Sequence, residues 1–294
     1  MIDVAPFTAH WQVALPGLLV AVTAMVVMAA DAVAPPGERD GLAVLGILGL
    51  GAAGATAAWL WVPGDNAGGF QDTLRADRYA LFFTVLLCAG SLLTVLLSVD
   101  YLREQPLPAG EYHALVLLST SGMIFLAAAN DLIVLFLALE IMSVAVYVLA
   151  GMLRREVRST EAALKYFLLG AFATGFLLYG IAFFYAAAGS TRLDVIAHAV
   201  ARDGLTAYTI LGIALVLVGF GFKVALIPFH VWAPDVYEGA PTAVTAFMAV
   251  GVKAAAFAAF VRVFLSAFAP LRPDWSVVVS VVICMMVWDL PWLV

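Results

Sequence analysis

Long runs of apolar residues, separated by short polar or turn-forming segments, extend along this whole 294-residue chain. A helix needs about 20 apolar residues to cross the ~30 Å hydrocarbon core of a bilayer. Runs of about that length lie at Trp11–Ala30, Gly41–Val62, Tyr79–Val99, Tyr112–Ala129, Leu132–Met152, Ala162–Ala187, Tyr208–Trp232, Pro241–Ala269 and Val277–Val294. The pattern predicts an all-α, polytopic transmembrane helix bundle of about nine spans. The short breaks leave little room for an extramembrane domain, so residues 1–294 are predicted to form a single membrane domain.

Composition excludes a water-soluble fold. The chain is 65% hydrophobic and 12% charged, whereas soluble domains are about 45–50% apolar and about 25% charged. The net charge of −6 is scattered, and no basic patch suggests a nucleic-acid partner. Neither the two cysteines nor the four histidines show metal-ligand spacing, so no metal and no redox cofactor is expected in this chain. Residues 1–10 contain no lysine or arginine, so the first run is predicted to stay as a membrane helix and not to be a cleaved signal.

Two local motifs bear on nucleotide binding and on orientation. Gly49–Gly54 matches the GxGxxG fingerprint of dinucleotide sites, but that fingerprint needs a strand before it and a helix after it. Here the glycines lie inside an apolar run, where small residues let helices pack closely. The densest positive cluster, Arg154–Arg158, lies between the fifth and sixth runs. The positive-inside rule therefore places that loop in the cytoplasm and the N-terminus outside.

The lysines are distributed differently from the arginines. Eleven arginines lie at or near the ends of the runs, whereas the three lysines, Lys165, Lys223 and Lys253, all fall inside runs. A lysine at the bilayer centre costs about 2.5–3.5 kcal/mol on insertion scales. A buried lysine can lose its proton, whereas arginine stays charged. This pattern therefore indicates proton exchange within the membrane.

The depth of each lysine follows from the 1.5 Å rise per residue of a helix. Lys253 lies ~18 Å and Lys223 ~22 Å beyond the start of its run, near the middle of the membrane. Lys165 is only a few residues into its run, and snorkelling to the surface is the alternative for this side chain. A structural lysine that is fixed in helix packing and transfers no proton is the alternative for all three positions.

Glu140 is the acidic counterpart of these lysines. It lies about 12 Å from the nearer end of its run, with Ser143 and Tyr147 on the same helical face. A buried carboxylate requires a cationic partner, and at this depth the lysines are the candidates. Approach of the two groups favours their charged forms, and separation favours their neutral forms, so the pair is a hypothetical proton switch. A fixed structural ion pair is the alternative.

The seventh run is predicted to be broken. Pro228 has no N–H to donate and its ring crowds the carbonyl of Val224, so the helix is expected to kink or open there. Irregular backbone inside a membrane is tolerated where it is buried in protein or lines a wet cavity. His230 follows directly and is a candidate proton relay, with an interfacial histidine as the alternative.

Three segments carry a resemblance to a known family: Leu139–Ser143, Glu161–Phe167 and Lys223–Lys253, the last containing Pro228–Thr242. They closely resemble the subunit N family of the bacterial proton-pumping NADH:quinone oxidoreductase, or respiratory complex I, over nearly the whole chain. The long third segment is the most specific. The lysine in the sixth run favours this subunit over its two larger antiporter-like relatives.

The resemblance implies an antiporter-like fold with inverted five-helix repeats and a discontinuous seventh helix. One complete repeat would cover residues 112–269, preceded by N-terminal helices at 11–99. The family's polar axis matches Glu140, Lys165, Lys223, His230 and Lys253, which would transfer protons within a translocase. The resemblance places NADH, FMN, the iron–sulfur clusters and quinone in partner subunits. It also implies other membrane subunits and the lipid bilayer as partners, and a multi-pass location in the bacterial plasma (inner) membrane.

The end of the chain departs from the family. The family continues to a second broken helix with another lysine, whereas this chain stops in its ninth run. Residues 287–292 stand where small residues leading to a glycine-rich turn are expected. The chain is therefore expected to be C-terminally truncated, with residues 277–294 as the start of an incomplete segment. Two alternative functions stay open: a subunit of a multisubunit Na⁺/H⁺ antiporter, and a truncated remnant that does not pump.

Overall fold

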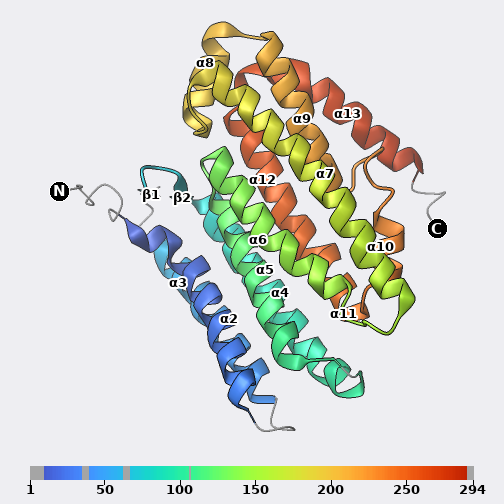
Figure 1. Cartoon of the computed structure of the whole chain (residues 1–294). Helices are drawn as coiled ribbons and strands as arrows, with labels where there is room; N and C mark the ends of the chain where they lie inside the picture. The colour runs from blue at the N-terminus through green and yellow to red at the C-terminus, as the bar shows by residue number, and fades with distance from the viewer. Residues whose placement is uncertain (1–9, 35–39, 62–66, 106, 290–294) are drawn as a thin grey trace.

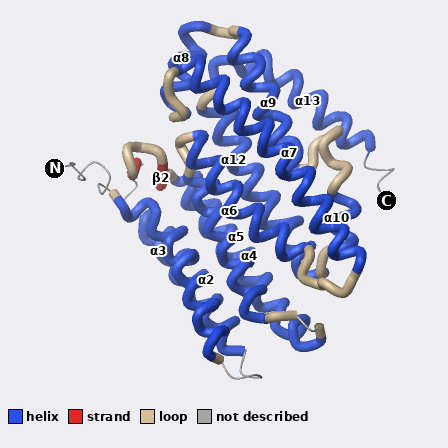
Figure 2. Tube along the Cα trace, viewed as in Figure 1, coloured by secondary structure: helices blue, strands red, loops and turns tan. Residues whose placement is uncertain are grey.

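The computed structural model describes residues 10–34, 40–61, 67–105 and 107–289, and most of them lie in helices (Figures 1 and 2). The long helices are α2 (Leu15–Val33), α3 (Asp40–Trp61), α4 (Arg78–Glu104), α5 (Ala109–Ala128), α6 (Leu132–Ala150), α7 (Val157–Ala188), α9 (Ala207–Val224) and α12 (Lys253–Ser266). The other elements are the 3₁₀ turn Trp11–Ala14, β1 (Ala67–Gly69), β2 (Leu74–Ala76), α8 (Leu193–Asp203), α10 (Ala233–Gly239), α11 (Thr242–Phe247), the π-helical turn Met248–Val252, the 3₁₀ turn Ala269–Leu271 and α13 (Arg272–Asp289).

Eight segments of the described chain are long and apolar enough to cross a membrane. They coincide with the first eight predicted runs, from Trp11–Val33 to Thr242–Ser266, so the prediction of an all-α, multi-span bundle is confirmed. The ninth run overlaps α13, which is not among the eight because it begins at Arg272 and carries further acidic residues. Residues 290–294 of that run lie outside the described residues.

Helix α5 forms the centre of the bundle. Within its most apolar stretch 78% of the residues are buried, against 39% for α2, α3 and α7. It packs against α2, α4, α6 and α12, while α3 is held mainly by α2 and α4. Gly49 of α3 serves this packing, since a methyl group there would overlap Thr23 of α2. Helices α7 and α9 form a second closely packed pair, where a Cβ at Gly219 would come within 2.6 Å of Leu177.

One end of the bundle is joined by hydrogen bonds between loops that are far apart in the sequence. The tight turn at Asn130 and Asp131 links α5 to α6, and Asp131 caps α6 by accepting from Ile133 N–H at 2.8 Å. The second carboxylate oxygen of Asp131 accepts from the Thr191 hydroxyl at 2.6 Å. The short β1–β2 hairpin and α8 lie at this end, and α10 and α11 lie at the opposite end (Figure 1).

The seventh span is interrupted as expected. Helix α9 ends at Val224, and Ala225 adopts a left-handed conformation with φ of 57°. The chain then passes through Pro228 in irregular turns before α10 begins at Ala233. The indole N–H of Trp232 donates to the carbonyl of Phe222 at 3.0 Å, so one carbonyl freed by the break has a side-chain partner. The break therefore begins among buried residues, Ala225 to Ile227, directly after α9, whereas Pro228 and Val231 are exposed.

Candidate functional site

Lys223 lies in the last turn of α9 and is 1% exposed. Its ammonium lies over the rings of Tyr147 at 5.0 Å, Tyr166 at 5.3 Å and Phe222 at 5.8 Å from the ring centroids. Tyr166 in turn stacks on Trp232, with 4.5 Å between centroids and 9° between planes. We call Tyr147, Tyr166, Phe222 and Trp232 the aromatic cage. It is assembled from α6, α7, α9 and the segment after the break.

The cage gives Lys223 a single hydrogen bond, which it donates to the Tyr147 hydroxyl at 3.2 Å. Aromatic faces attract a cation by about 2 kcal/mol when the contact is desolvated. That attraction offsets only part of the cost of burying a charge. The amine is therefore held by weak, neutral groups.

Glu140 points into the same region without touching the lysine. One of its carboxylate oxygens is buried and makes no hydrogen bond within the described chain. No ion pair joins Glu140 to Lys223 in the structure described, although the carboxylate acts on the amine through its charge. The Glu140–lysine switch therefore stays a prediction, and in this conformation the two groups interact through their charges without an ion pair in the described structure. The physical reason is that the Tyr147 ring, one turn further along the same helical face as Ser143, occupies the position beside the amine.

Two more predicted residues, His230 and Lys253, follow Pro228 in the chain. The buried Nδ1 of His230 has no hydrogen-bond partner among the described residues, which leaves this nitrogen free to accept or carry a proton. Lys253 begins α12 directly after the π-helical turn, and its ammonium lies 5.2 Å from the Tyr237 ring centroid. Burial raises the pKa of Tyr237 to about 12, so this phenol stays protonated at neutral pH.

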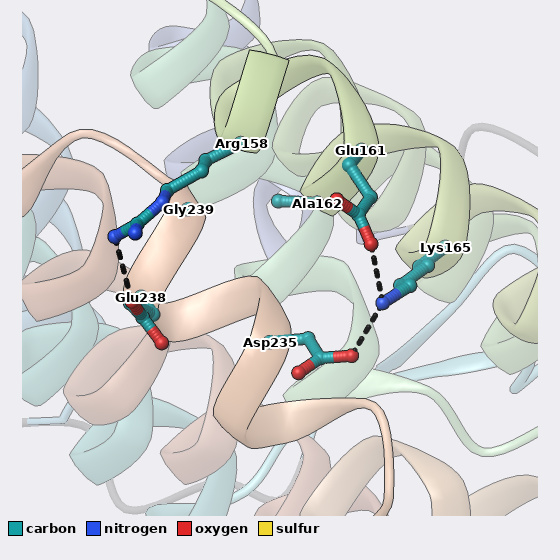
Figure 3. A pocket seen from close by; sticks show the side chains of 7 residues that line it. All are labelled: Arg158, Glu161, Ala162, Lys165, Asp235, Glu238 and Gly239. Atoms are coloured by element: carbon teal, nitrogen blue, oxygen red, sulfur yellow. Dashed lines mark hydrogen bonds and ion pairs between the residues drawn. The ribbon is translucent and has the colours of Figure 1, made fainter. Parts of the chain in front are cut away.

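Lys165 lies apart from this cluster. Its ammonium forms two ion pairs of 2.6 Å, with Glu161 one turn earlier on α7 and with Asp235 of α10. Figure 3 shows this arrangement beside a second pair, Arg158–Glu238 at 2.9 Å. The Lys165 side chain is 42% exposed. Lys165 thus occupies the mouth of a polar pocket between α7 and α10 and not the buried axis, as the snorkelling alternative anticipated.

A second buried cation was missed. Arg262 of α12 is 7% exposed, although the sequence pattern suggested that arginines stay near the ends of spans. Its guanidinium donates to both Asp77 oxygens at 2.7 and 2.8 Å and to the Ala127 carbonyl at 3.0 Å. Its position seven residues inside the eighth run was the available signal. Tyr166, Phe222, Trp232 and Asp235 were missed as well, because their roles arise only from contacts between distant segments.

Several known proteins resemble this chain in sequence or in fold. "NADH-quinone oxidoreductase subunit N" of Trichlorobacter lovleyi is 43% identical over 271 residues, which is 92% of this chain and 55% of the relative. A chain of respiratory complex I from Thermus thermophilus matches with a TM-score of 0.71 and 39% identity over 84% of this chain and 52% of that one. The Mrp complex from Dietzia sp. shares the fold, with a TM-score of 0.71 at 22% identity, 88% of this chain and 50% of that chain being covered.

The chain spans about half the length of the curated relatives it matches. The sequence profile described as "NADH:quinone oxidoreductase/Mrp antiporter, TM" matches residues 129–287, from the turn before α6 to α13. That match includes Glu140, all three lysines and the broken seventh span. Because it covers more than half of the chain, this protein belongs to the NADH:quinone oxidoreductase/Mrp antiporter family of membrane proteins.

Proposed function

We propose that this chain is a proton-translocating membrane subunit of a bacterial NADH:quinone oxidoreductase of the complex I type. The observation that carries the proposal is Lys223, a lysine that is 1% exposed beside a broken membrane helix and held by one neutral hydrogen bond. A lysine needed only for packing gains from a carboxylate partner, which this one does not contact. A lysine that shuttles protons needs its two forms to lie close in energy.

In this proposal Glu140, Lys223, His230 and Lys253 transfer protons along the interior, and Lys165 acts at the mouth of the polar pocket. Lys223 and Glu140 precede the break in the chain, His230 lies within it, and Lys253 follows it. Irregular backbone between them leaves peptide groups that are not paired within a helix. Such backbone is tolerated in a membrane where it is buried in protein or lines a wet cavity. The break thus connects two sets of titratable side chains.

The redox chemistry would belong to partner subunits. The names of the relatives support a complex that acts on NADH and quinone. NADH, FMN, the iron–sulfur clusters and quinone would then be bound by subunits other than this chain. Other membrane subunits of that complex and lipid are the proposed partners, and the bacterial inner membrane is the proposed location. We also propose that residues 11–99 form an N-terminal helix group, that 112–269 form one antiporter-like repeat, and that 277–294 begin a further segment.

A Na⁺/H⁺ antiporter subunit is the second candidate, and the structural likeness to the Mrp complex supports it. A remnant that assembles without pumping is the third. Co-purification separates the first two, because the chain should be recovered either with NADH-oxidising subunits or with small antiporter subunits. In membrane vesicles, acidification driven by NADH and insensitive to Na⁺ would favour the first candidate.

The test of proton transfer is substitution of Lys223 in the native complex. Lys223→Ala should abolish most of the proton pumping coupled to NADH oxidation, with assembly retained. Lys223→Arg should not restore pumping, because arginine keeps its proton. The exposed Arg202→Ala serves as the control and should pump like the wild type. Wild-type pumping by the arginine variant would exclude deprotonation at this position.

A further inference from the structure

The two tyrosines of the aromatic cage differ in one respect. Both rings face the Lys223 ammonium at nearly the same distance, 5.0 Å for Tyr147 and 5.3 Å for Tyr166. Only the Tyr147 hydroxyl accepts a hydrogen bond from that ammonium within the described structure. The cage therefore contains one tyrosine whose oxygen contacts the proton-carrying nitrogen and one whose ring alone does so.

The fold makes space for the Tyr147 hydroxyl. A methyl group at Gly170 of α7 would overlap this hydroxyl, so the absence of a side chain there fixes where the oxygen lies. Tyr147 is 7% exposed and its ring packs edge-on against Tyr166, with 4.7 Å between centroids. The hydroxyl is thus positioned by α7 against a lysine of α9.

Tyr147 also leads back to Glu140 along one face of α6. Ser143 lies between them, and the steps from Tyr147 to Ser143 and from Ser143 to Glu140 are four and three residues, or ~6 Å and ~4.5 Å along the helix axis. Tyr147 is near enough to Ser143 and Glu140 for both to influence its hydroxyl electrostatically. The Ser143 hydroxyl is completely buried and donates to the Leu139 carbonyl. A buried Glu140 oxygen without a hydrogen-bond partner in the described structure is available at the end of the series.

We propose that Tyr147 is a proton-relay residue that connects Lys223 to Glu140 through Ser143, a role that rests on the proton-translocating function proposed above. A Lys223 N–H bond breaks as its proton passes to the Tyr147 oxygen. The phenolic proton passes to the Ser143 oxygen, and the serine proton passes to the Glu140 carboxylate. Lys223 becomes a neutral amine and Glu140 a neutral acid, while both hydroxyl groups are regenerated. The reverse sequence restores the two charges.

Phenylalanine substitution separates the hydroxyl from the ring. Tyr147→Phe keeps the cation–π face and removes the oxygen, and Tyr166→Phe is the matched control in the same cage. Both variants would be expressed in the native complex, with assembly checked by co-purification, and assayed by NADH-driven acidification of membrane vesicles. Tyr147→Phe should lower the initial rate at least about tenfold, since acid–base groups typically contribute that much or more. Tyr166→Phe, which keeps its ring in the cage and removes an oxygen that accepts no hydrogen bond from the ammonium in the described structure, should lower the rate clearly less than Tyr147→Phe.

Ser143→Ala provides a second variant with little effect on packing, and it should lower the rate in the same direction as Tyr147→Phe. Equal losses in the two phenylalanine variants would overturn the relay, because they would reflect packing of the rings. Wild-type pumping by Tyr147→Phe would also overturn it. If Lys223→Ala abolishes pumping while Tyr147→Phe does not, the relay fails and the proposed function stands. If Lys223→Ala pumps normally, the proposed function itself fails.

Discussion

The two buried cations are stabilised in opposite ways, and the difference matches their chemistry. The Arg262 guanidinium donates hydrogen bonds to both oxygens of Asp77 and to a backbone carbonyl, so its partners include a full counter-charge. The Lys223 ammonium lies against aromatic rings and donates one hydrogen bond to a neutral hydroxyl. A guanidinium stays charged at any physiological pH and so requires a permanent counter-charge. An amine paired as strongly would hold its proton, so the loose environment of Lys223 is consistent with exchange.

At Lys165 the ion pairs to Glu161 and Asp235 predict a charge-swap rescue. Lys165→Asp alone should destabilise the packing of α10 on α7, because the new carboxylate would face those of Glu161 and Asp235 without the ammonium between them. Adding Asp235→Lys should restore thermal stability by re-forming an opposite-charge pair. Pumping should stay low in the double variant, since the lysine proposed to act on α7 is missing.

The neighbouring pair Arg158–Glu238 provides the control for that experiment. Its swap, Arg158→Glu with Glu238→Arg, should recover stability and pumping together. If the Lys165–Asp235 swap recovered full pumping, Lys165 would act only as a structural link between the two helices.

At the scale of elements, the Asp77–Arg262 pair is predicted to hold α12 against the start of α4. Asp77→Asn leaves the guanidinium, whose side chain is 6% exposed, without a counter-charge. Removal of one partner of a buried pair costs about 3–5 kcal/mol. Chemical denaturation in detergent should therefore show a clear loss of stability. The double variant Asp77→Asn/Arg262→Met should recover much of it, and an unchanged Asp77→Asn midpoint would contradict the assignment.

The same pair sets a pH dependence whose sign follows from Asp77. Burial alone would raise the pKa of this carboxyl, but the hydrogen bonds from Arg262 outweigh burial and hold the pKa below its ordinary value. A carboxyl with a depressed pKa stabilises the fold above its unfolded pKa, about 3.9. That stabilisation should be lost as the pH falls below about 4, and the loss should be absent in the double variant.

How much of this arrangement could be read from the sequence depends on whether a feature is local. The spans follow from apolar runs, and the break after α9 follows from Pro228, because both depend on residues close together in the chain. Lys223 and Glu140 were identified by the cost of burying a charge. The aromatic cage could not be predicted, because Tyr147, Tyr166 and Trp232 meet only when three separate segments pack together. For the same reason the sequence could not show that Tyr147 would contact the Lys223 ammonium in place of Glu140 in the described structure.

For the whole molecule, exposed positions at the two ends of the bundle can test the predicted orientation in the membrane. The loop before α7 is predicted to be cytoplasmic, but Ser159 is a poor labelling position because it is buried and donates to the Ala150 carbonyl at 2.7 Å. Glu156 is exposed at the start of α7. A cysteine introduced at Glu156, with the exposed Cys284 replaced by serine and the buried Cys88 retained, should resist an impermeant thiol reagent in intact cells.

Arg202 of α8 lies at the other end of the bundle and supplies the opposite result. A cysteine there should be labelled in intact cells under the same conditions. Labelling of the Glu156 position together with protection of the Arg202 position would invert the proposed orientation.

The end of α9 has an electrostatic consequence that side chains do not share. Peptide dipoles in a helix add up to about half a negative charge at its C-terminus, carried by the last carbonyl groups. Because α9 stops at Val224, this partial charge is carried by the helix turn that also contains the buried Lys223. It is made of backbone, so it neither takes up a proton nor disappears when a neighbouring residue is substituted. The lysine therefore has a permanent fractional counter-ion that favours its charged form without binding its proton, and exchangeable groups nearby need only supply the remainder.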